Sequence, residues 1–295
     1  MSNYDAIIIG SGPNGLAAAI TLAQNEQRVL VLEAKDTIGG GTRTAEITLP
    51  GFQHDICSAI HPLGIASPFF RHLPLTDFGL EWIYPPAALA HPLDDGRTAI
   101  LSRSIEESAA SMGVDGSAYK NLMTPLVDSW LEILGDILGP FPLTPRHPLI
   151  LARFGLQAMR SLRGLADSHF KGQAARGLFA GLAGHGMLPL EEPTTASIAL
   201  VLGMLAHAVG WPIPKGGSQA ISNAMAAYLK SLGGEIITDR EVTSLDGLPD
   251  AGAVLFDVTP RQILQICGDR LPAGFTAFYD GSRHHPDSTS CQPLP

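Results

Sequence analysis

The residues most capable of chemistry form a glycine pattern near the amino terminus, Gly10-Ser11-Gly12-Pro13-Asn14-Gly15. At this spacing, between a strand and a helix, the first glycine permits a tight turn and the second lets backbone approach a pyrophosphate. The third lets the helix pack closely on the sheet. The helix start also presents unpaired N–H groups and a partial positive charge to phosphates. We therefore expect a dinucleotide-binding turn here.

An acid follows this pattern at a suitable distance. Glu33 ends the next aliphatic run, close to the spacing of about 20 residues expected for a carboxylate that binds ribose hydroxyls. Its charge would repel a 2′-phosphate, which argues against NADP. We place Glu33 and its neighbour Ala34 in the predicted site. The alternative is a solvated acid at a strand end.

A second glycine run follows within one short loop, Gly39-Gly40-Gly41-Thr42-Arg43. A second stretch of bare backbone near the dinucleotide favours FAD over NAD, and the Arg43 guanidinium can bind a phosphate. The alternative is an ordinary flexible loop.

Three elements must position these residues. Tyr4–Ile9 and Arg28–Leu32 are short aliphatic runs, typical of parallel strands covered on both faces. Gly15–Asn25, rich in Ala and Leu, predicts a helix between them. A right-handed β-α-β unit would set the two strands side by side.

The pattern becomes mainly helical between Ser67 and Trp211. We predict strands at 80–84 and 98–101, helices at 118–138 and 149–165, and a rigid proline-rich connector around 140–148. Ser104 and Glu107 predict a helix N-cap with a capping box. The apolar run 196–209 predicts a buried helix better than a membrane span.

An α/β pattern resumes after Trp211, with a helix at 218–232 and strands or a hairpin at 235–238, 242–245 and 253–256. The predicted fold is α/β: a Rossmann-like FAD-binding domain with a parallel sheet, interrupted by a mainly helical substrate or cap domain. The predicted divisions are 1–66, 67–211 and 212–273, with a disordered, frameshift-like tail at 274–295.

These motifs resemble a known family. The segment from Val29 to Gly40 resembles the FAD fingerprint of phytoene desaturase-like and amine oxidase-like flavoproteins. The continuation to Thr44 and the segment 50–55 are most similar to phytoene dehydrogenase-related NAD(P)/FAD-dependent oxidoreductases. The segments 214–218 and 232–235 resemble that family's second conserved block.

The resemblance implies that residues 11–14 bind the pyrophosphate, Glu33 the adenosine ribose, and residues 40–43 the phosphate and ribityl side. It implies that Val242 contacts adenine through its backbone, although a core strand position is the alternative. The implied reaction is FAD-dependent hydride removal from a C–H bond of a lipophilic substrate to flavin N5. We assign no catalytic residue.

Members of that family are longer and return a further glycine-rich segment to the flavin, which this sequence lacks. We therefore expect the adenine half of the site without the isoalloxazine half. Two alternatives follow: a truncated, catalytically inactive flavoprotein remnant, or an NAD-dependent dehydrogenase.

Composition excludes some functions. A net charge of -9 over 295 residues argues against nucleic acid. Cys57, Cys267 and Cys291 are widely spaced, which predicts free thiols in a reducing compartment and no metal site. We predict a cytoplasmic location.

Two weaker signals carry alternatives. Arg146, Arg153, Arg160 and Arg163 would share one side of a basic amphipathic helix, which could contact a membrane peripherally or simply be a solvated face. His61 could line a substrate site or be structural. His284 and His285 lie in the predicted tail and receive no role.

Overall fold

The computed structural model describes residues 3–139, 145–272, 274 and 276, and it divides into two compact units. Unit 1 combines Met1–Ala59, Pro74–Trp82 and Pro214–Pro295, and unit 2 combines Ile60–Leu73 and Ile83–Ile213. The segment Pro74–Trp82 thus belongs to unit 1, although it lies inside the predicted insertion 67–211. The predicted tail lies outside the described residues apart from 274 and 276.

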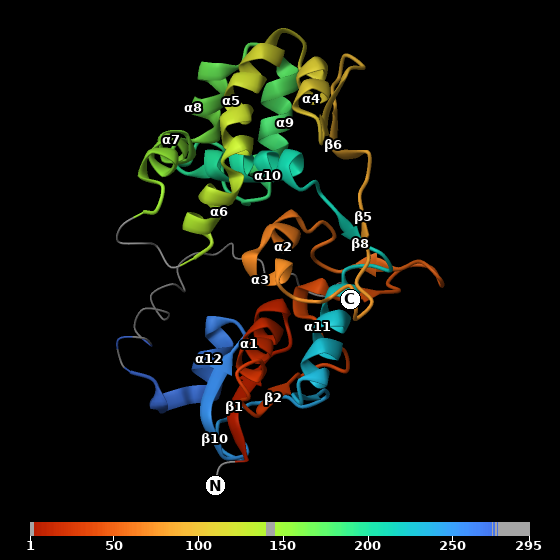
Figure 1. The fold of residues 1–295 in the computed structure, drawn as a ribbon, viewed down its shortest axis with the longest axis vertical. Coiled ribbons are helices and arrows are strands. Elements are labelled where there is room, and N and C mark those ends of the chain that lie inside the picture. The colour runs from red at the N-terminus through yellow and green to blue at the C-terminus, as the bar shows by residue number, and fades with distance from the viewer. Residues whose placement is uncertain (1–2, 140–144, 273, 275, 277–295) are drawn as a thin grey trace. The chain divides into compact units, whose positions relative to one another are not determined.

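Unit 1 is built on a four-stranded sheet in the order β10-β1-β2-β9. Its strands are β10 (Ala251–Phe256), β1 (Tyr4–Ile9), β2 (Val29–Leu32) and β9 (Glu235–Ile237). All three pairings are parallel. Figure 1 shows β10, in blue, beside β1, in red, so the two ends of the described chain meet in one sheet. The predicted α/β class and the parallel pairing of β1 and β2 are confirmed.

Helices cover both faces of this sheet. Alternate strand residues point to opposite faces, and Ile7, Ile9, Leu30 and Leu32 form one buried cluster with residues of α12 (Pro260–Cys267). On the other side, α1 (Pro13–Ala23) contacts β1 and β2 and packs against α11 (Gln219–Ser231). Burial on both faces explains why β1 and β2 are aliphatic without alternation.

One predicted strand of unit 1 is wrong. Residues 242–245 are irregular. The chain leaves β9 through Asp239, whose φ is 54°, and the Arg240 N–H donates to the Glu33 carbonyl at 2.8 Å. The segment therefore passes the end of β2 instead of pairing as a strand.

The remaining elements of unit 1 are small. The strands β3 (Thr44–Ala45) and β4 (His54–Asp55) pair antiparallel. Short 3-10 turns occupy Gly40–Thr42 and Gly268–Arg270. Two further short strands, β5 (Trp82–Ile83) and β8 (Ile213–Pro214), lie where the chain passes from one unit to the other.

Unit 2 is mainly helical. Its helices are α2 (Pro62–Ala66), α3 (Pro68–Arg71), α4 (Ile105–Ser111), α5 (Gly116–Asp128), α6 (Trp130–Ile137), α7 (Pro148–Ala158), α8 (Leu162–His169), α9 (Gln173–Gly184) and α10 (Thr195–Ala208). A 3-10 turn spans Gly113–Asp115, and β6 (Ala87–Pro92) pairs antiparallel with β7 (Thr98–Ser102). The helix α10 is buried along most of its length and contacts α5, α7, α8 and α9, which confirms the predicted buried helix.

Two predicted helices are each divided in two. The predicted helix 118–138 breaks at Ser129 between α5 and α6, four residues after Pro125, whose ring removes a helical N–H. The predicted helix 149–165 breaks after α7, because the Ser161 side chain caps a new helix, α8, by accepting the Gly164 N–H at 3.1 Å.

This second break corrects the predicted basic helix. Arg146 precedes α7, Arg153 lies in α7, Arg160 lies between helices and Arg163 lies in α8. The four arginines therefore do not form one face of one helix.

Several smaller predictions can be placed. Ser104 caps α4 by accepting the Glu107 N–H at 3.2 Å, so the predicted N-cap is confirmed. Some residues named from the sequence lie outside the described part of the chain: Pro140 and Pro142 of the predicted connector, His284, His285 and Cys291. Cys57 is exposed, and Cys267 is a buried free thiol. In the described part of the chain, every helix is too short or too polar to cross a membrane.

Candidate functional site

The glycine turn joins β1 to α1 at the carboxyl edge of the sheet. Gly10 has a φ of 102°, a left-handed conformation that side chains disfavour, and its N–H donates to the Leu32 carbonyl at 2.8 Å. Pro13 begins α1, where its missing N–H removes no helical hydrogen bond. The Leu16 N–H donates to the Gly12 carbonyl at 2.9 Å. The strand, turn and helix predicted from sequence are therefore present in the order that a dinucleotide fold requires.

Glu33 connects this turn to the end of β2. One of its carboxylate oxygens accepts both the backbone N–H and the hydroxyl of Ser11, at 3.0 and 2.5 Å. The other accepts the Lys35 N–H at 3.0 Å. Glu33 is 9% exposed, so a buried carboxylate is held by three donors beside the glycine turn. The solvated acid considered from the sequence is wrong.

The second glycine loop packs against the first. Gly39 and Gly40 have φ values of 113° and 52°, and the Gly39 N–H donates to the Ser11 carbonyl at 3.0 Å. A Cβ added to Gly40 would lie 3.2 Å from the Gly12 Cα. The Arg43 Nε donates to the Gly40 carbonyl at 3.0 Å. This ordered packing contradicts the flexible loop considered as the alternative.

The segment 214–218, which leads into α11, anchors the chain that follows this loop. Asp55 accepts the Thr44 hydroxyl at 2.6 Å and the Ser218 N–H at 2.7 Å. Gly217, with a φ of 92°, fits only without a side chain, because an added Cβ would lie 2.5 Å from the Thr44 hydroxyl oxygen. The segment 214–218 therefore has a structural role: it fixes the chain that follows the second glycine loop.

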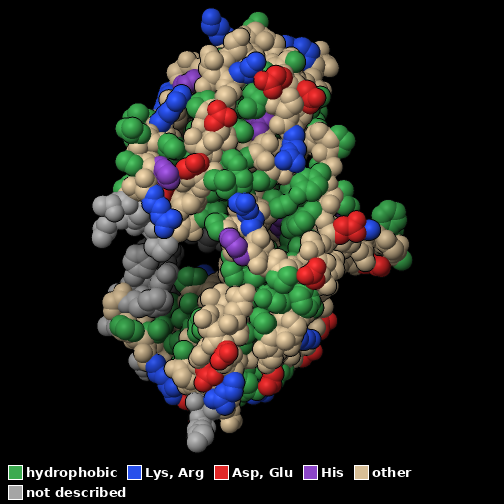
Figure 2. All heavy atoms as spheres, in the orientation of Figure 1, with side chains coloured by type: hydrophobic (Ala, Val, Ile, Leu, Met, Phe, Trp, Pro, Cys, Tyr) green, Lys and Arg blue, Asp and Glu red, His purple; other side chains and the backbone are tan. Residues whose placement is uncertain are grey.

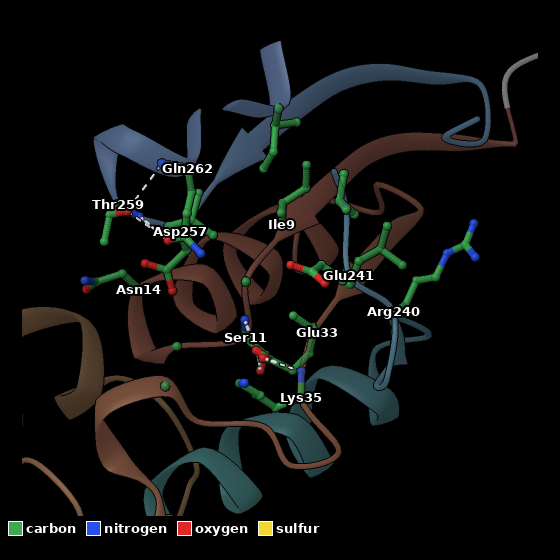
Figure 3. A pocket seen from close by; sticks show the side chains of 18 of the residues that line it. Ile9, Ser11, Asn14, Glu33, Lys35, Arg240, Glu241, Asp257, Thr259 and Gln262 are labelled. Carbon is green, nitrogen blue, oxygen red and sulfur yellow. Dashed lines mark hydrogen bonds between the residues drawn. The ribbon is translucent and has the colours of Figure 1, made fainter. Parts of the chain in front are cut away.

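A cavity of about 850 Å³ opens between these segments in unit 1. Of the predicted site residues, all except Gly15 and Gly39 line it: Gly10, Ser11, Gly12, Pro13, Asn14, Glu33, Ala34, Gly40, Gly41, Arg43 and Val242. Figure 3 shows Ser11 and Glu33 together on one side of this cavity, Asp257 beside Asn14 on another, and Arg240 at the far end.

The cavity also contains residues that sequence reasoning missed. The stretch 240–243 contributes Arg240, Glu241 and Thr243 as well as Val242, and the segment after β10 contributes Asp257, Thr259 and Gln262. Thr259 and Gln262 form a capping box at the start of α12. The sequence pattern Thr-x-x-Gln was the available signal for that box. Nothing in the spacing of Asp257 connects it with residues 10–15.

Backbone donors remain open where a phosphate would bind. Among the described residues, no acceptor takes the N–H of Gly12, Asn14 or Gly40. These amides belong to the start of α1 and to the adjoining glycine loop, where the helix dipole favours an anion. Within the described residues, Arg43 donates through Nε alone, so its other guanidinium nitrogens retain their donors in the cavity wall.

Other predicted features lie elsewhere. His61 is the N-cap residue of α2 in unit 2 and is not among the residues that line this cavity. Across residues 3–139 and 145–272, no group of three or more His, Cys, Asp or Glu side chains could hold a metal ion.

Comparisons with known proteins agree with this architecture. The family model described as an NAD(P)-binding Rossmann-like domain matches residues 8–73. Pyridine nucleotide-disulfide oxidoreductase domain-containing protein 2 of Mus musculus is 25% identical over 284 residues, which cover 82% of this chain and 48% of that protein. The flavin-containing amine oxidase A of Equus caballus is 54% identical over 41 residues, covering 14% of this chain and 8% of that protein.

A solved structure extends the likeness over nearly the whole chain. Cyclohexylamine oxidase from Brevibacterium oxydans has a TM-score of 0.56 and 17% identity, and the match covers 94% of this chain and 63% of that one. The chain therefore contains a Rossmann-like domain over residues 8–73 and shares the fold of this solved oxidase. It spans about half the length of the mouse protein that it matches.

Proposed function

We propose that unit 1 binds FAD and that the chain acts in a flavin-dependent oxidation. The observation that carries the proposal is the convergence of two glycine loops and one buried carboxylate on a single cavity. A dinucleotide needs close backbone approach for its diphosphate and an acceptor for its ribose. Both are present within one wall of this site.

Different residues of the cavity would hold the diphosphate, the ribose and the adenine of the cofactor. The open amides of Gly12, Asn14 and Gly40, with the Arg43 guanidinium, would hold the diphosphate. Glu33 retains acceptor capacity beyond its three protein donors and would hold the adenosine ribose. The irregular stretch around Val242 would contact the adenine, and an irregular backbone suits this role because its polar groups are not all used in a ladder.

The bound flavin would accept a hydride at N5 from a substrate C–H bond, leaving a double bond in the substrate. The residues of unit 1 would position the cofactor and neutralise its diphosphate. We propose a lipophilic substrate and phytoene dehydrogenase-like chemistry on the strength of the sequence resemblance, and we assign no residue as a catalytic base.

The test is direct. The purified chain should bind FAD, seen as near-ultraviolet and blue absorbance that stays with the protein through gel filtration. Gly12→Ala should abolish this, because the new Cβ would lie 2.5 Å from an Asp257 carboxylate oxygen. Gly184→Ala is the matched control, since Gly184, like Gly12, has no left-handed φ, and no atom lies within 4 Å of an added Cβ.

Titration of the purified chain with FAD and with NADH separates the proposed function from the two alternatives. An NAD-dependent dehydrogenase would bind NADH more tightly than FAD, and an inactive remnant would bind neither at micromolar concentration. Either result would overturn the assignment of FAD to this site.

We also propose that α7 contacts a membrane surface. Leu149, Leu156 and Met159 are 85%, 75% and 66% exposed and recur at helical spacing along and just beyond α7. Arg146 and Arg153 are exposed beside them and form no ion pair within the described residues. Figure 2 shows hydrophobic and basic side chains along the margin of unit 2 where Figure 1 places α7. An apolar stripe flanked by arginine suits an anionic lipid surface.

A further inference from the structure

Asp257 contacts the glycine turn from a distant part of the sequence. It follows β10, and because β10 pairs with β1, its N–H donates to the Ile9 carbonyl at 2.8 Å. Its carboxylate Oδ2 accepts the Gly15 N–H at 2.8 Å. An acid more than 240 positions away in the sequence thus binds the first turn of α1.

The glycine pattern is fitted around this residue. A Cβ added to Gly10 would lie 2.3 Å from the Asp257 carbonyl oxygen, and one added to Gly12 would lie 2.5 Å from Oδ2. One added to Gly15 would lie 2.4 Å from the Gly10 carbonyl oxygen and 2.9 Å from Oδ2. The missing side chains therefore make room for the carboxylate of Asp257 as well as for a phosphate.

A carboxylate of the protein is unusual at the place where a phosphate is expected to bind. The amino end of a helix favours an anion, and here a protein carboxylate already takes one of the amides. The open amides of Gly12 and Asn14 belong to the same turn. A diphosphate bound to them would bring its charges next to Asp257, where repulsion between like charges opposes binding.

The other charges of the cavity do not remove this conflict. Its wall carries three acids, Glu33, Glu241 and Asp257, and three bases, Lys35, Arg43 and Arg240. Arg261 stands four residues beyond Asp257 on the exposed side of α12. The bases balance the acids one for one, so a diphosphate adds negative charge to a neutral wall.

We propose that Asp257 is a specificity-determining residue of this site: its negative charge limits the affinity for the dinucleotide diphosphate. The inference rests on the proposed nucleotide site. Replacing the Asp257 carboxylate by an uncharged amide would remove the repulsion, while the amide oxygen could still accept the Gly15 N–H.

The test uses the full chain and two probes. ADP-ribose carries a diphosphate esterified at both ends, so its charge is constant between pH 5 and 8, and adenosine carries none. Binding is measured by calorimetry for the wild type and for Asp257→Asn, whose amide oxygen can still accept the Gly15 N–H. We expect Asp257→Asn to bind ADP-ribose about tenfold more tightly at pH 7.5. Adenosine should bind both proteins equally, because it carries no diphosphate.

Controls distinguish the possible failures. Glu241→Gln removes an acid from the segment 240–243 of the same cavity, and it should raise the affinity less than Asp257→Asn does. If adenosine and ADP-ribose bind but Asp257→Asn does not tighten ADP-ribose at pH 7.5, the nucleotide site stands and the role of Asp257 is wrong. If neither probe binds the wild type, the proposed function fails and the inference fails with it. Circular dichroism of each variant confirms folding, and Asp257→Glu, which keeps the charge, should not tighten binding.

Discussion

The Ser11 hydroxyl and the Ser11 backbone N–H both donate to one carboxylate oxygen of Glu33, at 2.5 and 3.0 Å. This contact joins the glycine turn after β1 to the end of β2, two segments that the sheet already places side by side. The Glu33 carboxylate, which we propose as the ribose acceptor, is therefore held by donors of the protein itself, so that it loses little rotamer freedom on binding.

Glu33→Gln should weaken both folding and binding. The amide can accept fewer hydrogen bonds than the carboxylate, so one Ser11 or Lys35 donor should lose its partner. We expect a loss of about 1–3 kcal/mol in the free energy of unfolding. ADP-ribose affinity should fall at least tenfold, by calorimetry. Glu241→Gln is the control, because it removes a charge from the same cavity without disturbing Ser11. Equal effects of the two variants would contradict a specific role for Glu33.

Gly40→Ala should separate the two glycine loops. The added Cβ would lie 3.2 Å from the Gly12 Cα, and the φ of 52° is unfavourable for alanine. We expect about 1–2 kcal/mol of destabilisation and a clear loss of FAD affinity. Gly51→Ala tests the strain alone, since Gly51 has a φ of 83° and no neighbour within 4 Å of the added atom. If Gly51→Ala lowered FAD affinity as much, crowding against Gly12 would not be the cause.

His207 should make unit 2 less stable in acid. Its Nδ1 lies 3.2 Å from the Arg103 carbonyl oxygen, so Nδ1 carries the proton and Nε2 accepts the Tyr119 hydroxyl at 2.6 Å. Burial lowers the pKa of His207 below its ordinary value of 6.5. Below about pH 6.5 the unfolded chain takes up a proton that the folded chain does not, so stability is complete above that pH and falls below it.

Urea unfolding of unit 2, followed by tryptophan fluorescence, measures this effect. Between pH 7.5 and 5.5 the wild type should lose up to about 1 kcal/mol more than His207→Gln. His72→Gln, which changes an exposed histidine of the same unit, should behave like the wild type. Identical pH profiles for the wild type and His207→Gln would exclude a contribution from this histidine.

Replacing Leu149 and Leu156 together by serine should abolish membrane contact without loss of stability. Both side chains are largely exposed, so folding gains little from them. Sedimentation with vesicles rich in phosphatidylglycerol should recover the wild type and leave the double variant in solution. Val114→Ser is the control, because Val114 is 82% exposed elsewhere in unit 2. Equal sedimentation of the wild type and the double variant would remove α7 as the contact.

The sequence predicted the parts of the site that are close together along the chain. Gly10, Gly12, Gly15 and Glu33 belong to one β-α-β unit, where hydrophobic pattern and spacing decide the geometry. The second glycine loop follows within ten residues of Glu33. Patterns within one short stretch of sequence were therefore enough to predict the lining residues that come from the first 43 positions.

The other lining residues of the cavity follow β9 and β10, and their position depends on pairing between strands that lie far apart in the sequence. Asp257 reaches the glycine turn only because β10 lies beside β1, and one sequence gives no register for strands so far apart. Val242 and Thr243 are β-branched and favour a strand, but the hydrogen bond from the Arg240 N–H to the Glu33 carbonyl directs the chain along the end of β2. Helix breaks at Ser129 and Ser161 were similarly hidden, since apolar residues continue through both.

The order of strands in the sheet bears on how the chain matures during synthesis. β1 and β2 leave the ribosome early, but their outer partners β9 and β10 emerge only after the whole of Ile83–Ile213. The helical unit can therefore form its own core while the nascent α/β layer still has two open edges. Until residue 256 is available, those two edges present unpaired strand backbone, the feature by which strands pair with other chains.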